Sequence, residues 1–86
     1  SWRDTESTTR MWELIHENDV EGIQSWLDDA PDAALIRSAD GRGPLWWAYE
    51  HRNKKIVKLL KKYGADPMAE DAKGLRPKQM MTKKKN

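Results

Sequence analysis

A spacing of 33 residues recurs along this 86-residue chain, and this period limits most strongly how the chain can fold. Gly41 precedes Gly74 by 33 residues, and Pro44 precedes Pro77 by the same distance. A fixed period of this length is typical of repeat proteins, in which each unit buries its apolar face only against its neighbours. The period therefore predicts a short stack of similar units.

Each unit is predicted to contain a pair of short helices, because its apolar residues follow the helical spacing. In the first pair, the opening helix is expected to be capped within Ser7-Thr8-Thr9 and the next helix by Asp19. In the second pair, Pro44 suits a first helical turn and Asn53 a cap, while Gly64 ends the second helix. The sequence thus predicts helix, turn, helix and a longer glycine-containing loop, repeated.

The segment GRGPLWWAY at 41–49, with IVKLL at 56–60 and GAD at 64–66, resembles an ankyrin repeat. The family pattern is approximately D-x-x-G-x-T-P-L-H-x-A-A-x-x-G-H-x-x-I-V-x-L-L-L-x-x-G-A-D. The resemblance implies an all-α solenoid of stacked helix–turn–helix pairs joined by β-turn-like loops. The structural positions that it assigns are Gly41, Pro44, Leu45, Ala48, Ile56, Val57, Leu59, Leu60, Gly64, Asp66, Gly74 and Pro77.

The resemblance also implies a division of the chain. A loose lead-in is expected over 1–7, the ankyrin repeat domain over 8–82 and a basic tail over 83–86. The expected repeats cover about 8–36, about 37–69 and, as a truncated cap, 70–82.

Two adjacent tryptophans occupy the middle repeat and are expected to have different roles. Trp46 stands where the family has histidine, so we expect it to pack between repeats through apolar contacts. The extra tryptophans Trp12, Trp26 and Trp46 are expected to help keep the short stack folded. Trp47 falls at a position that, by resemblance, points to the concave surface, where an exposed indole would anchor an interface. The alternative is that Trp47 lies flat on lysine stems or under the Trp2 lead-in.

The family resemblance implies a binding module for another protein, which would contact the turn tips and the concave face of the inner helices. Trp47 would be the apolar anchor, and Arg42 would form a bidentate pair with a carboxylate or a backbone carbonyl. The expected partner-binding residues are Asp40, Arg42, Trp47, Glu50, His51, Glu13, His16 and Glu17.

The sequence contains no recognisable catalytic or metal-binding motif. His16 and His51 are the only histidines, and the repeat offset places them near one face, beside carboxylates that could help them bind a metal or transfer protons. No H-x-x-x-H or H-E-x-x-H spacing supports either role, so we expect surface histidines. No nucleophile elbow or phosphate-binding loop is present. The sequence predicts a non-enzymatic protein without metal or cofactor.

Charge is distributed unevenly along the chain, and other functions stay open. Residues 1–36 hold nine acidic and two basic residues, net −7, while 37–86 hold fourteen basic and five acidic residues, net +9. The lysine-rich segment 54–62 is expected to be a solvated outer face, or else a contact for an acidic partner, nucleic acid or an anionic membrane. Self-association through opposite charges is also open, as is a purely structural role as a capping segment of a larger protein.

The location is expected to be intracellular and cytoplasmic, because the chain has no cysteine and no apolar run long enough for a membrane span or signal peptide. Lys83 and Lys84 lie three and two residues before Asn86 and resemble a K-K-x-x retrieval signal. If Asn86 is the native C-terminus, this resemblance implies a cytosolic tail on an endoplasmic-reticulum membrane protein.

Overall fold

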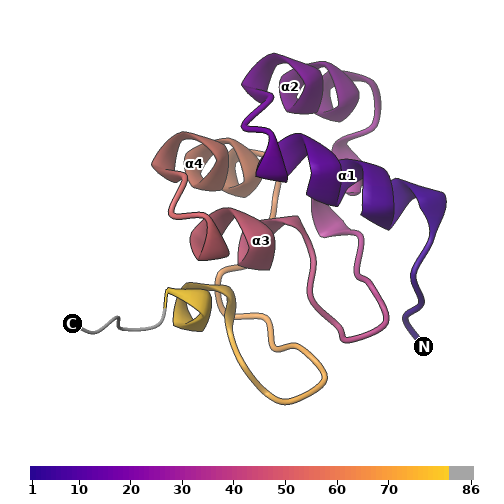
Figure 1. The fold of residues 1–86 in the computed structure, drawn as a ribbon, viewed down its shortest axis with the longest axis vertical. Helices are drawn as coiled ribbons and strands as arrows, with labels where there is room; N and C mark the ends of the chain where they lie inside the picture. The colour runs from indigo at the N-terminus through magenta and orange to yellow at the C-terminus, as the bar shows by residue number, and fades with distance from the viewer. Residues whose placement is uncertain (82–86) are drawn as a thin grey trace.

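The computed structural model describes residues 1–81, which form two helical pairs followed by a loop and a final helical turn (Figure 1). The α-helices are α1 (Glu6–His16), α2 (Val20–Asp29), α3 (Pro44–Glu50) and α4 (Lys54–Lys62), and the two 3₁₀ helices are η1 (Pro31–Leu35) and η2 (Pro77–Met80). No strand occurs within 1–81, so the predicted all-α class is confirmed. The basic tail over 83–86, with its retrieval-like lysines, lies outside the described residues and stays a prediction.

The first helix begins earlier than predicted. Thr5, not a residue within 7–9, is its N-cap: the Thr5 Oγ1 accepts from the Thr8 N–H at 3.1 Å, and the Thr8 Oγ1 accepts from the Thr5 N–H at 2.8 Å. This reciprocal pair satisfies two backbone donors that would otherwise lack partners. Part of the expected lead-in is therefore helical.

Both helical pairs turn in the same way, which is the clearest structural repeat in the chain. Asn18 and Arg52 take the left-handed conformation, with φ of 58° and 54°. Each is followed by the predicted cap, in which Asp19 accepts from the Gly22 N–H at 2.9 Å and Asn53 from the Ile56 N–H at 3.0 Å. The caps predicted at Asp19 and Asn53 are confirmed.

The core lies between two layers of helices. The inner helices α1 and α3 contact each other, as do the outer helices α2 and α4, and each inner helix packs on its own outer helix (Figure 1). Val57 and Leu59 are half-buried at the edge, whereas the other apolar positions that the resemblance assigns to the helices are buried, namely Pro44, Leu45, Ala48, Ile56 and Leu60. The fully buried large apolar side chains of the four helices are Met11, Ile15, Ile23, Leu27, Leu45, Ile56 and Leu60.

The two loops that precede α3 and η2 stack on each other. Gly41 and Gly74 occupy equivalent turns with φ of 82° and 83°, as their 33-residue spacing predicts. The Ala72 N–H donates to the Asp40 carbonyl at 2.9 Å and joins the two loops directly. A Cβ on Gly41 would lie 2.6 Å from the Ala72 nitrogen, so the close approach of the loops requires glycine.

The structure contains one short helix that the sequence did not predict. Pro31 follows the end of α2 as expected, but residues 31–35 then form η1, which buries Ala33 and Ala34 against the core. Proline at the first position suits this turn, because its fixed φ is helical and its missing N–H costs nothing there. No helix within 1–81 combines the length and the apolar character needed to cross a membrane.

Candidate protein-binding face

The exposed anchor predicted at Trp47 is wrong, because this indole is buried with 7% of its surface exposed. All five residues from Pro44 to Ala48 are buried. The reason is that α3 is short and has neighbours on several sides, with α1, α4 and η2 all packed against it. No side of its first turns is left open for an exposed indole.

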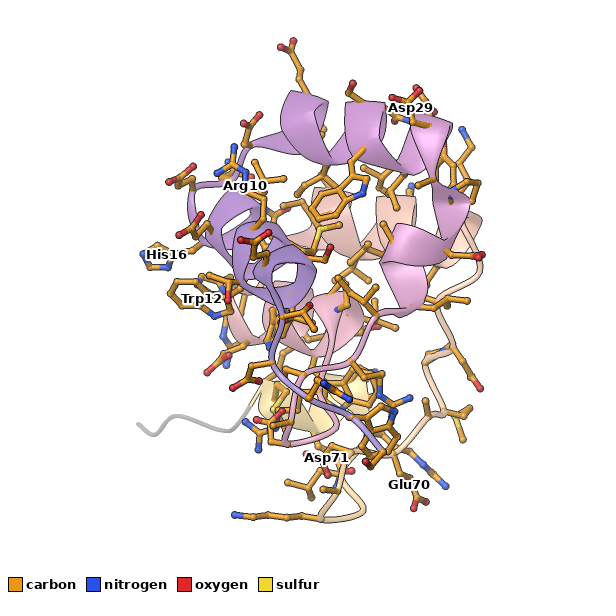
Figure 2. The ribbon with its side chains drawn as sticks, turned by 90° about the vertical axis from the view of Figure 1, so that its right-hand side faces the viewer. Arg10, Trp12, His16, Asp29, Glu70 and Asp71 are labelled. Carbon is orange, nitrogen blue, oxygen red and sulfur yellow. The ribbon has the colours of Figure 1, made fainter. Side chains whose placement is uncertain are left out.

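Trp12 is the exposed indole of the inner face, with 40% of its surface exposed. Its ring stacks on His16, with centroids 4.9 Å apart and an interplanar angle of 7°. Figure 2 shows both side chains projecting from the same side of α1. The repeat offset could have indicated that Trp12 occupies the position on α1 that Trp47 occupies on α3. Trp12 precedes Trp47 by 35 residues, the same distance that separates His16 from His51.

The two histidines meet across the repeats, as the offset predicted. The Nδ1 of His16 lies 3.1 Å from the Nε2 of His51, and the Nδ1 of His51 lies 2.9 Å from the Trp47 carbonyl oxygen. Both histidines are exposed. Among residues 1–81, no three His, Cys, Asp or Glu side chains gather in a way that could hold a metal ion.

A pocket of about 250 Å³ opens beside Trp12, between the N-terminal segment, α1 and the tip of the first loop. We call it the inner-face pocket; it is lined by Asp4, Thr8, Thr9, Trp12, Ser38 and Trp47. The Asp4 Oδ1 accepts from the Ala39 N–H at 2.9 Å, so the N-terminal segment is tied to the loop tip. Trp47, although largely buried, also forms part of the wall of this pocket.

Arg42 and Asp40 brace the loops, contrary to the prediction that Arg42 would be available as a bidentate partner. The Arg42 Nε donates to the Asp71 Oδ2 at 3.0 Å, and Asp40 accepts from the Arg42 N–H at 3.0 Å. Asp71 also accepts from the N–H groups of Lys73 and Leu75. Burial alone would raise the pKa of Asp71, but these hydrogen bonds outweigh it and hold the pKa below its usual value.

The remaining predicted site residues are carboxylates on the inner side. Glu13 is half-buried and pairs with Arg10 at 3.4 Å, whereas Glu17 and Glu50 are exposed. Glu17 caps the C-terminus of α1, and Glu50 is the last residue of α3. They give this side of the molecule an acidic character without forming a defined site.

Trp46 fills the contact between repeats, as predicted, but not by apolar contacts alone. Its Nε1–H donates to the Leu75 carbonyl at 3.0 Å, and the Arg37 guanidinium lies 4.6 Å from its ring centroid. Tryptophan thus supplies a polar link between repeats in place of the threonine and histidine of the family pattern.

A second surface lies between α4 and η2, where a larger hollow of about 670 Å³ is found. We call it the basic groove; it is lined by Tyr49, Arg52, Lys54, Val57, Lys58, Lys61, Lys78 and Met81. Tyr49 and Val57 are half-buried, so the groove combines an apolar floor with a basic rim.

Comparison with known families agrees with this geometry. Residues 40–72 match the family model described as Ankyrin repeat. No curated protein matches the chain. The matched segment contains the loop, α3, α4 and the start of the second loop, which are the elements that repeat in the structure. Residues 40–72 are therefore an ankyrin repeat, which supports the resemblance that the sequence indicated.

Proposed function

We propose that this chain is a non-enzymatic module that binds another protein at the inner-face pocket, with Trp12 as the apolar anchor. Ankyrin repeats generally bind other proteins, which supports the class of function. We choose this surface because the exposed Trp12 indole lies beside a pocket that a second indole, that of Trp47, also lines. Exposed tryptophan next to a concavity is typical of interface hot spots.

The pocket suits a lysine or arginine side chain of the partner. Trp12 and Trp47 offer aromatic surface, and Asp4 offers a carboxylate at the same pocket. A cation is attracted both to an indole face and to a carboxylate. The net charge of −7 over residues 1–36, which include α1 and α2, would also speed the approach of a basic segment.

Peptide display against the immobilised chain tests this proposal. We expect selected peptides to share a lysine or arginine and to bind Trp12→Ala at least about tenfold more weakly, because the anchor is lost. Met68→Ala is the matched control, since Met68 is exposed but does not line the pocket. Equal binding to Trp12→Ala, or selected peptides without a shared cation, would contradict the proposal.

The basic groove supports a second candidate, an acidic protein segment bound along α4. Five of the eight lining residues are lysine or arginine and none is acidic. Its apolar floor fits an amphipathic acidic helix better than a nucleic-acid backbone. Lys58→Glu with Lys61→Glu should abolish binding of an acidic amphipathic peptide and leave inner-face binding intact. If double-stranded DNA or anionic vesicles bind more tightly than that peptide, with a steep salt dependence, this candidate fails.

A further inference from the structure

We propose that His16 and His51 form a binding site for a divalent transition-metal ion such as Zn²⁺. The two side chains come from different repeats; the repeat offset placed them near one face, but the sequence favoured surface histidines over a metal site. Their Nδ1 and Nε2 atoms lie 3.1 Å apart. Zinc–nitrogen bonds of about 2.0–2.1 Å at a tetrahedral angle place two ligand nitrogens about 3.3 Å apart. The separation of the two nitrogens therefore suits one ion, and both rings must turn so that their lone pairs point to the same place.

Both rings are oriented before an ion arrives. The Nδ1 of His51 is 2.9 Å from the Trp47 carbonyl, which requires a proton on Nδ1 and leaves the Nε2 lone pair facing His16. This contact to a backbone carbonyl is the usual orienting bond of a metal-binding histidine. Trp12 stacks on His16 and holds the plane of that ring. The two rings meet nearly at right angles, at 80°.

The two neutral histidine rings carry the same number of protons before and after metal binding. Without metal, the neutral His16 ring donates its Nδ1 proton to the His51 Nε2 across the 3.1 Å contact. Metal binding requires that proton to move to the His16 Nε2, through water, because Nδ1 becomes a ligand. No net proton is lost from the neutral pair.

The site supplies two ligands, and the other coordination positions are open. No third His, Cys, Asp or Glu completes a metal site within residues 1–81. Both histidines are exposed, so water or a group from another molecule can occupy those positions. Glu17 and Glu50, each next to one of the histidines in sequence, add negative charge that favours a cation, which the positive charge of Arg52 beside His51 partly offsets.

Zinc titration by calorimetry tests this inference, using the whole chain and the variants His16→Gln and His51→Gln. The chain has no other histidine and no cysteine to compete. We expect one Zn²⁺ per chain, and each single variant should bind at least about tenfold more weakly because the second ligand no longer adds its intramolecular advantage. Circular dichroism confirms that the variants are folded. Wild-type affinity no higher than that of either variant would overturn the inference.

A second measurement avoids substitution altogether. In the ¹⁵N NMR spectrum of the wild-type histidine rings, one equivalent of Zn²⁺ should shift the His16 Nδ1 and the His51 Nε2 together. Unchanged shifts, or a shift at one ring alone, would show that the pair is only a hydrogen bond. Failure of peptide binding at the inner-face pocket would not affect this result, so the metal-site proposal and the peptide-binding proposal can each be refuted independently of the other.

Discussion

At the scale of single residues, Asp71 organises the second loop. Its side chain is 1% exposed and accepts hydrogen bonds from Arg42, Lys73 and Leu75. These donors stabilise the ionised carboxylate, so its pKa in the folded chain lies below the usual 3.8. One carboxylate therefore fixes its own turn and links it to the preceding loop.

Asp71→Asn should lower the free energy of unfolding by about 2 kcal/mol near pH 7, because hydrogen bonds to a charged group and the Arg42 pair are lost. A folded-state pKa that is lowered gives stability that is present above the unfolded pKa and lost as the pH falls through the folded pKa. The difference between wild type and variant should therefore shrink below about pH 4. Urea unfolding at a series of pH values measures it, and a constant difference would refute the assignment.

At the scale of elements, side-chain caps fix the starts of α1, α2 and α4, and Gly22 shows how closely one cap is packed. A Cβ on Gly22 would lie 2.7 Å from the Asp19 Oδ2, the carboxylate that caps α2. The close neighbour that a helical glycine suggests is thus the cap of its own helix. This explains why a helix former such as alanine does not occupy the position.

A double-mutant cycle tests this coupling. Gly22→Ala should give little or no stabilisation in the wild type, because the gain of about 1 kcal/mol in helix propensity is offset by loss of the cap. In the Asp19→Ala background, which has no carboxylate to displace, the same change should stabilise the chain by up to about 1 kcal/mol. Thermal unfolding followed by circular dichroism measures both. Equal effects in the two backgrounds would exclude the coupling.

The outer helices are joined by a polar cluster of Asp28, Tyr63 and Gln24. The Tyr63 hydroxyl donates to Asp28, and the Gln24 Nε2 donates to Asp28 at 2.9 Å and to the Tyr63 oxygen at 2.8 Å. The bond from Tyr63, followed by that from Gln24, holds the pKa of Asp28 below its usual value. The Asp28 carboxylate in turn raises the pKa of Tyr63.

Tyr63→Phe should raise the pKa of Asp28 toward its usual value of 3.8, because the main donor is removed. An NMR titration of the side-chain carboxyl carbon gives this pKa directly. Lys62→Gln is a suitable control, since its Coulombic effect on Asp28 is smaller. If Lys62→Gln moved the pKa more than Tyr63→Phe did, the hydrogen bond would not be the cause.

At the scale of the whole molecule, Arg37 connects parts of the chain that are distant in sequence. Its guanidinium lies between two indoles, 4.3 Å from the centroid of Trp2 and 4.6 Å from that of Trp46. It also donates to the carbonyls of Gly41 and Glu70, one in each loop. The N-terminal segment, both loops and α3 therefore meet at one side chain.

Arg37→Lys should lower the free energy of unfolding by about 2 kcal/mol, because an ammonium cannot stack between two rings and reach two carbonyls at once. Arg76→Lys is the matched control: the Arg76 guanidinium forms an exposed pair with Glu70 at 3.9 Å, and the Arg76 backbone N–H, which donates to Gln79, is kept in the variant. The control should change stability by no more than about 0.5 kcal/mol. Urea unfolding compares them, and equal losses would show that Arg37 has no special role.

The sequence by itself determined the repeat period, the helical pairs, the caps at Asp19 and Asn53 and the glycine turns. These features depend on a residue and its near neighbours, so local pattern is sufficient. The first cap at Thr5 was missed because several neighbouring Ser and Thr residues could serve. The 3₁₀ turn after Pro31 was missed because its pattern is short.

Only the tertiary structure decided what each candidate site residue contacts. Trp47 is buried and Trp12 exposed because η2, which follows 27 residues after Glu50, packs against α3 and adds to its burial, while Trp12 keeps an open side on α1. Arg42 is engaged by Asp71, and His16 meets His51, through stacking of repeats far apart in sequence. Exposure and pairing depend on neighbours from other repeats, and a single unit's sequence does not contain them.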